Sequence, residues 1–166
     1  MSFQKKVRIV VWLVTGIALI PAFLKAEGAY RPTRDGGNFG IGLEAGDPGT
    51  WGISGKVWID HENAFQGAVK LPGGSALLQL DYLWHDFALI HMKNTEGEWP
   101  FYVGVGGDLS LNTPVAIAAR VPVGMSYIFD KKNVPVDIYI QVVPALWLTS
   151  PTSFYVYGEF GAHYYF

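Results

Sequence analysis

Apolar and non-apolar residues alternate along this chain from Asn38 to its last residue, Phe166, in eight segments. In the final segment the even-numbered residues from Phe154 to Phe166 are aliphatic, aromatic or glycine, whereas the odd-numbered ones include Glu159 and His163. Because successive side chains of a strand point to opposite faces, a period of two predicts strands with one apolar and one polar face. No segment of this part of the chain has the period of an amphipathic helix, so we expect an all-β domain.

Turn residues separate the eight segments. Asp47-Pro48-Gly49, Pro72-Gly73-Gly74 and Asn133-Val134-Pro135 are combinations that favour tight turns. The predicted strands are Asn38–Ala45, Trp51–Ile59, Asn63–Lys70, Ser75–His85, Phe101–Leu111, Ala116–Phe129, Val136–Leu148 and Ser153–Phe166. Eight successive strands joined by short turns predict an antiparallel up-and-down meander. Closure of that meander into a barrel removes its exposed edges.

The same alternation fits two opposite arrangements. In a secreted, lipocalin-like soluble binder the apolar face points inward, whereas in a membrane barrel it points outward to lipid. If both ends of the barrel domain lie on one side, several outward aromatic residues gather at a single rim. This aromatic girdle comprises Phe39, Tyr82, Trp84, Phe101, Tyr127 and Phe129, with Tyr164 and Phe166 beside it. Aromatic residues at one depth mark a membrane–water interface, so we favour an eight-stranded transmembrane β-barrel.

The first 26 residues have a different composition. Lys5, Lys6 and Arg8 precede the apolar run Ile9–Ile20, and Ala26 provides a small residue for cleavage. This layout predicts a secretory signal peptide, with export by the Sec pathway. The alternative, an uncleaved anchor, needs an apolar run of about 20 residues, longer than this one. The expected organisation is therefore a signal peptide at 1–26, a polar leader at 27–37 and a barrel at 38–166.

Composition excludes several classes of function. The 166 residues suit one domain, and the absence of cysteine excludes disulfide scaffolds, thiolate metal sites and cysteine nucleophiles. The net charge of −2 gives no reason to expect a nucleic-acid partner. We expect no cofactor either, because the glycine-containing segments 40–42 and 104–107 are not followed by the helix that a phosphate-binding loop requires.

The non-apolar face contains the best-defined candidate site, a lumen polar cluster. Its predicted members are Glu44, Lys56, Asp81, Asp108, Arg120, Asp137, Glu159 and His163. The pattern thus places five carboxylates opposite two cations, Lys56 and Arg120. We expect Arg120 to pair with Asp108 on the preceding strand and to reach Asp81, and Asp137 to lie opposite His163 or Tyr165. An eight-stranded barrel has an interior that side chains fill, so a plug is favoured over a narrow cation-preferring pore.

Other polar motifs indicate no catalytic or metal-binding residue. Asp60-His61-Glu62 lies in a predicted turn without a partner cluster, and His85-Asp86 with His91 is equally isolated. A lipid-modifying enzyme of the outer membrane would need a serine and a histidine together on the lipid-facing surface. The chain has no His-x-Ser pair, and His163 falls on the inward phase. This activity remains an alternative without an assigned site.

The predicted connections differ in length between the two ends of the barrel. Those on the side away from the termini have only a few residues, whereas Asp86–Pro100, on the terminus side, is long. Adhesins and receptors usually carry their binding residues on long outer loops, which this chain lacks. The long connection is either an extended hairpin or a contact site for a periplasmic partner.

The signal peptide, eight strands and terminal Phe166 together resemble the small eight-stranded outer-membrane proteins of Gram-negative bacteria. More narrowly, Asp81–His85, Arg120–Gly124 and Gly161–Phe166 are similar to a group of bacterial barrels without assigned activity. The resemblance implies insertion into outer-membrane lipid and recognition by the barrel-assembly machinery. The implied assembly signal comprises Phe160, Ala162, Tyr164 and Phe166. The function we expect is structural or interaction-based.

Overall fold

A computed structural model describes residues 30–33, 35–46, 49–71, 76–89, 97–129, 134–149 and 151–166. The predicted signal peptide, His91 and much of the Asp86–Pro100 connection lie outside these residues. None of the described residues belongs to a helix with the length and hydropathy needed to cross a membrane.

The described residues form ten strand segments, all paired antiparallel in one sheet. They are β1 (Phe39–Gly46), β2 (Thr50–Trp58), β3 (Asn63–Lys70), β4 (Leu77–Asp86), β5 (Gly97–Glu98), β6 (Phe101–Ser110), β7 (Ala116–Arg120), β8 (Val123–Phe129), β9 (Val136–Trp147) and β10 (Ser153–Tyr165).

Two pairs of segments share a position in the sheet. β5 and β6 follow one line beside β8, because the Ser126 N–H donates to the carbonyl of Pro100 between them at 3.0 Å. β7 and β8 follow one line between β6 and β9. Pro122 interrupts this line because proline has no N–H to donate, yet its carbonyl accepts the Gly104 N–H at 2.8 Å. Ten segments therefore fill eight positions.

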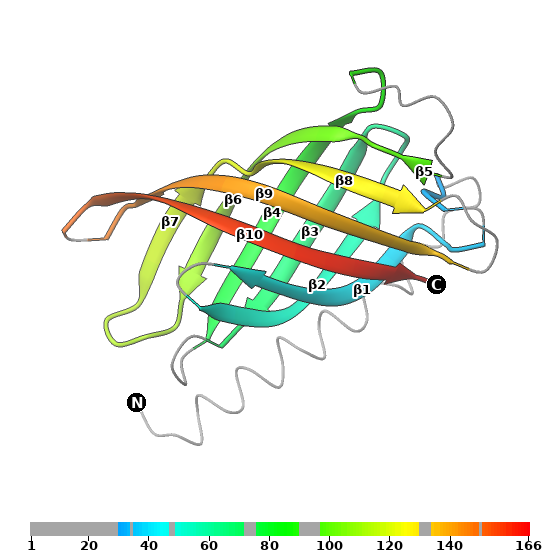
Figure 1. The fold of residues 1–166 in the computed structure, drawn as a ribbon. Helices are drawn as coiled ribbons and strands as arrows, with labels where there is room; N and C mark the ends of the chain where they lie inside the picture. The colour runs from blue at the N-terminus through cyan, green and yellow to red at the C-terminus, as the bar shows by residue number, and fades with distance from the viewer. Residues whose placement is uncertain are drawn as a thin grey trace.

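The sheet closes on itself, because β10 pairs with β9 on one side and with β1 on the other. This confirms the predicted all-β, eight-stranded antiparallel up-and-down barrel. Strand bounds lie within two residues of those expected, except that β5 falls in the predicted Asp86–Pro100 connection and the predicted strand Ala116–Phe129 is interrupted between β7 and β8. β1 begins and β10 ends at the same end of the barrel (Figure 1), which we call the terminal rim. The opposite end, where β10 begins, is the far rim.

Polar side chains fill the interior and apolar ones cover the outside. Small apolar clusters, such as Leu83, Tyr102 and Tyr139, interrupt an otherwise polar interior. Along the described strands, the outward positions hold no Lys, Arg, Asp or Glu except Asp86, the last residue of β4. Large exposed side chains of the strands include Ile41, Leu43, Trp51, Ile53, Leu80, Val105, Ile140, Val142, Phe154 and Phe160. The charged face predicted from the alternation is thus the inner one.

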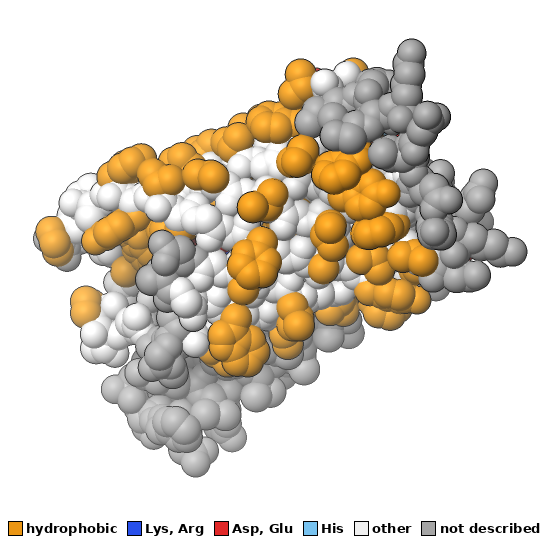
Figure 2. All heavy atoms as spheres, in the orientation of Figure 1, with side chains coloured by type: hydrophobic (Ala, Val, Ile, Leu, Met, Phe, Trp, Pro, Cys, Tyr) orange, Lys and Arg blue, Asp and Glu red, His pale blue; other side chains and the backbone are white. Residues whose placement is uncertain are grey.

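The six residues of the predicted aromatic girdle all occupy outward positions near the terminal rim. Neighbouring rings pack edge to face, with centroids 4.7 Å apart for Tyr82–Trp84 and 4.5 Å for Tyr127–Phe129. Figure 2 shows hydrophobic side chains over the strands, gathered most densely toward this rim.

Candidate functional site

The eight predicted members of the lumen polar cluster all lie inside the barrel, and none is more than 3% exposed. Alternation along the strands brings them together, because strands on every side of the ring direct one polar face to the same interior. Ions buried to this degree must be paired, so their partners define the site.

Arg120 joins three carboxylates. Its Nη1 donates to Asp108 Oδ1 at 2.8 Å, its Nε lies 3.2 Å from Asp81 Oδ1, and its Nη2 pairs with Glu159 Oε2. The diagonal pair with Asp108 and the contact with Asp81 were both predicted. Glycine makes room for them, because a Cβ at Gly106, opposite Arg120, would collide with the Asp81 carboxylate.

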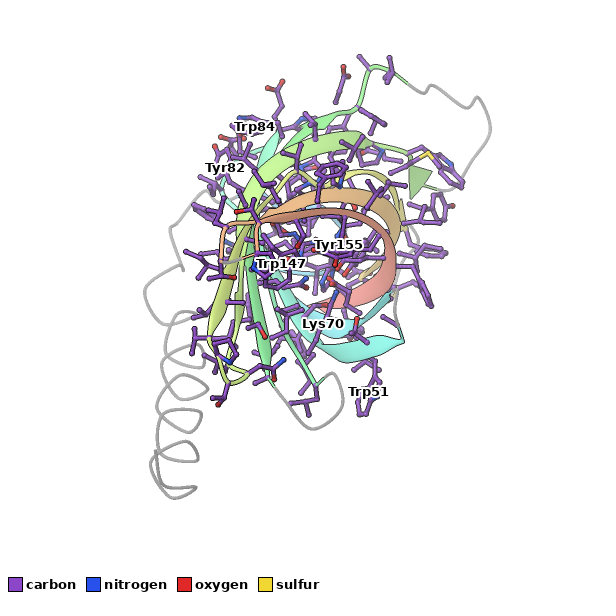
Figure 3. The ribbon with its side chains drawn as sticks, turned by 90° about the vertical axis from the view of Figure 1, so that its left-hand side faces the viewer. Trp51, Lys70, Tyr82, Trp84, Trp147 and Tyr155 are labelled. Atoms are coloured by element: carbon purple, nitrogen blue, oxygen red, sulfur yellow. The ribbon has the colours of Figure 1, made fainter. Side chains whose placement is uncertain are left out.

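Lys70 is a third buried cation, so the predicted balance of five carboxylates to two cations is wrong. Its Nζ pairs with Glu44 Oε1 and lies 2.5 Å from Glu159 Oε1. The side chain points into the barrel from the end of β3 (Figure 3). The alternation along β3 could have predicted this inward position, because Lys70 lies on the same face of the strand as Gln66. Among the described residues, the lumen holds two more carboxylates than cations when His163 is neutral.

Asp137 is the centre of a second cluster, nearer the terminal rim. It lies opposite His163 in the β9–β10 pairing, as predicted, and its Oδ1 is 3.0 Å from His163 Nδ1. The Tyr165 hydroxyl donates to Asp137 Oδ2 at 2.8 Å, and Lys56 Nζ lies 3.5 Å from the same oxygen. Trp58 Nε1 donates to the Tyr165 hydroxyl at 3.0 Å, which links the cluster to the apolar end of the lumen.

Ser54, His163 and Asp137 have the hydrogen-bond order of a serine hydrolase triad. Ser54 Oγ lies 2.9 Å from His163 Nε2, and His163 Nδ1 lies 3.0 Å from Asp137 Oδ1. A nucleophile must also meet its substrate, whereas Ser54 is only 2% exposed in a packed interior. We therefore interpret this arrangement as part of the lumen network and assign it no catalysis.

Neutral polar groups connect the two ionic clusters. The Tyr139 hydroxyl donates to Glu44 Oε2 at 2.5 Å, and its ring stacks on His163 at 5.1 Å. Gln141 Nε2 donates to Glu159 Oε2 at 2.7 Å while its Oε1 accepts from the Tyr102 hydroxyl at 2.8 Å. Ion pairs, hydrogen bonds and the stacked rings of Tyr139 and His163 thus extend from Trp58 to Arg120. Such a continuous network fits a plug.

Aromatic residues lie over the far end of this network. Trp147 and Tyr155 occupy inward phases of β9 and β10, and both lie toward the middle of the ring seen from the far rim (Figure 3). Trp51, by contrast, points away from the barrel in the same view. Deeper in, the Tyr157 hydroxyl donates to Asp108 Oδ2 at 3.4 Å. The lumen is therefore lined by aromatic groups at its far mouth.

The remaining polar motifs lie at the terminal rim. Asp60 accepts hydrogen bonds from the Asn63 side chain and from the backbone N–H groups of Glu62 and Asn63, which hold the Asp60 pKa below its ordinary value. The described residues contain no group of three His, Asp or Glu placed to hold a metal ion. Of the His85, Asp86 and His91 set, His91 lies outside the described residues.

A comparison of the chain with protein-family models gives no matching family, and searches of curated proteins and of solved structures give no significant match.

Proposed function

We propose that this chain is a small outer-membrane β-barrel with a structural or interaction role and a lumen closed by its own side chains. The observation that carries the proposal is the polarity of the barrel: its charged residues lie inside and its apolar residues outside. A tilted strand of about 9–11 residues spans a bilayer, and six of the eight positions of this ring have nine residues or more.

The polarity favours a membrane barrel over a soluble lipocalin-like binder. A soluble monomer rarely exposes a continuous apolar patch larger than a few hundred Å². Here apolar side chains cover the outward positions around the ring, and Trp51, Ile53, Leu80 and Ile140 are each more than 60% exposed. A lipocalin-like binder would also need an apolar cavity, whereas this interior holds paired ions.

The packed interior supports a closed barrel over a cation-preferring pore. Arg120 and Lys70 each bridge carboxylates from different strands, so their side chains cross the lumen. The excess of carboxylates would attract cations to an open path, but eight strands leave an interior that side chains fill. We therefore expect no ion current through the native barrel.

Two segments of the chain support export and assembly. Residues 1–26 would direct secretion by the Sec pathway, and the outward series Phe160, Ala162, Tyr164 and Phe166 would be recognised by the barrel-assembly machinery. Phe166 is 70% exposed at the terminal rim, beside Tyr164 at a ring distance of 5.1 Å. In this orientation the terminal rim and the Asp86–Pro100 connection face the periplasm, where the connection could contact a partner.

Fractionation of a Gram-negative host that expresses the full chain tests the proposal. We expect the folded protein in the outer-membrane fraction and a different gel mobility before and after boiling, because the closed barrel resists detergent. Purified protein in planar bilayers should give no discrete conductance steps. Recovery in the periplasmic supernatant would contradict the membrane assignment, and cation-selective steps would favour the pore.

A further inference from the structure

The described part of the leader lies at the terminal rim, beside the end of β10 (Figure 1). Thr33 is only 4% exposed there, and its Oγ1 accepts a hydrogen bond from the Gly36 N–H at 3.1 Å. Gly36 packs so closely that an added Cβ would lie 2.6 Å from the Cβ of Tyr165 and 3.0 Å from that of Pro135. This part of the leader therefore packs on the starts of β1 and β9 and the end of β10.

Tyr30, at the other end of this segment, contacts a different side of the same mouth. Its ring packs edge to face at 5.4 Å from Trp58, 4.8 Å from His61 and 6.5 Å from Phe87. Burial first, and then the carboxylate of Glu98 in β5, raise the pKa of the Tyr30 hydroxyl above its ordinary value. The leader thus extends from the β9–β10 side of the ring to the side formed by β2, β4 and β5.

Beneath the leader, inward side chains of β2, β3, β8 and β10 form a buried apolar layer. Its members are Trp58, Ala64, Ile128 and Tyr165, and Tyr30 packs against them. The Tyr165 hydroxyl accepts a hydrogen bond from Trp58 Nε1 and donates one to Asp137, so the layer adjoins the second ionic cluster. Buried ion pairs are strongest where water is excluded. Access of water to Asp137 from this side therefore depends on the layer and on the leader above it.

We propose that the described leader residues, 30–33 and 35–37, are a strap that closes the terminal mouth and controls the access of solvent to the lumen from that side. None of them belongs to a strand, so the strap can leave the mouth without breaking any strand pairing. Asn38 holds its end to the barrel, because its Nδ2 donates to the Trp58 carbonyl at 3.3 Å. The inference rests on the proposed closed lumen and adds the segment that closes one end of it.

Thiol labelling of the folded full chain in a non-ionic detergent tests the proposal, because the chain contains no cysteine. Ala64→Cys places a single thiol in the apolar layer, where we expect slow reaction with a charged maleimide. Adding Tyr30→Ala, which removes the ring contacts of the strap, should raise the labelling rate about tenfold or more. Adding Gly36→Val instead should have the same effect, because a side chain at this position collides with Tyr165.

Two matched controls separate opening of the strap from general loosening of the barrel. Gly158→Val adds the same side chain on β10, where an added Cβ meets no described atom within 4 Å, so labelling of Ala64→Cys should change less than about twofold. Ala118→Cys places a thiol on an inward position of β7 toward the far rim, and Tyr30→Ala should not alter its labelling.

Three results would overturn the strap: fast labelling of Ala64→Cys in the otherwise unchanged chain, labelling that neither leader substitution raises, or an equal rise at Ala118→Cys. Gel mobility before boiling shows whether each variant is folded. If Gly36→Val does not fold, Tyr30→Ala decides, because it only removes atoms from a half-buried ring. Conductance steps through the parent barrel would instead overturn the closed lumen, and the strap with it.

Discussion

Arg120 contacts three carboxylates that come from three different strands, β4, β6 and β10. The planar guanidinium can donate along several directions in one plane, whereas an ammonium is a compact point charge. A single side chain on β7 therefore links one side of the ring to the other through its interior. Removing one partner from such a buried set leaves charges that neither water nor the protein compensates.

We expect Arg120→Ala to lower the free energy of unfolding by about 3–5 kcal/mol, because Asp81, Asp108 and Glu159 would face one another without their shared cation. Urea unfolding in detergent or lipid measures this change. Arg31→Ala, which removes an exposed arginine of the leader, is the control and should leave the unfolding midpoint unchanged. Conductance should stay absent in both variants. A current that appears in Arg120→Ala without loss of stability would make Arg120 a gate.

The ion pairs of the Lys70 ammonium inside the lumen could not be predicted from the sequence. Its phase matches that of Ala68 and Gln66, so alternation was consistent with an inward side chain, yet Lys70 was not among the predicted members of the lumen polar cluster. As the last residue of its segment, however, a lysine can also extend its flexible stem to water beyond the strand. The carboxylates that pair with Lys70 inside the barrel, Glu44 and Glu159, come from β1 and β10. Only closure of the ring brings those strands across from β3.

Asp60 provides a prediction outside the strands. Asn63→Ala should raise the Asp60 pKa toward its ordinary value, because the largest cause of its depression is the hydrogen bond from the Asn63 side chain. Carboxyl NMR titration of the folded chain measures the shift, and Asn112→Ala at the far rim is the control. Because the folded-state pKa is depressed, these hydrogen bonds stabilise the turn above the ordinary pKa, and the contribution disappears as the pH falls through the folded-state value. Identical Asp60 titrations in parent and Asn63→Ala would show that the contact is not populated.

At the scale of elements, the interrupted strand β7–β8 shows how the ring tolerates proline. The alternation predicted Ala116–Phe129 as one strand although Pro122 lies inside it, and proline usually argues against a central strand. The register continues across the break, since the Val121 N–H donates to the Pro144 carbonyl at 3.0 Å and the Pro122 carbonyl accepts from Gly104. The alternation of the side chains therefore predicted this strand position better than the presence of proline did.

β10 is the element that completes the ring, and its last residue carries a prediction about assembly. Deleting Phe166 should reduce the amount of folded barrel in the outer membrane, because the outward terminal aromatic is part of the proposed assembly signal. Quantitative blotting of unboiled membrane fractions measures the folded form. Phe154→Ala is the control, since Phe154 is also outward and exposed on β10 but lies at the far rim. Normal membrane levels of the chain lacking Phe166 would contradict the assembly-signal interpretation.

At the scale of the whole molecule, the sequence could predict which residues share a face but not, from alternation alone, which face is inside. Both a soluble barrel and a membrane barrel satisfy a period of two. The aromatic rim favoured the membrane barrel, because a soluble core has no reason to gather its aromatic residues at one end. The cleft that His61, Glu62 and Asp86 line at the terminal rim lay beyond prediction, since it forms where a turn between β2 and β3 meets the end of β4.

Arginine substitutions at two depths along the outer surface test whether that surface lies in a lipid bilayer. Val142 lies midway along the outward series of β9, and Leu148 directly follows the strand at the far rim, yet both are 52% exposed. In a bilayer, Val142→Arg should lower the free energy of unfolding by about 2–4 kcal/mol and Leu148→Arg by about 0–1 kcal/mol, because a charge is costly only within the hydrocarbon layer. In water the two equally exposed positions should respond alike. Urea unfolding of both variants in lipid vesicles measures the difference, and equal destabilisation would argue that this surface does not lie in lipid.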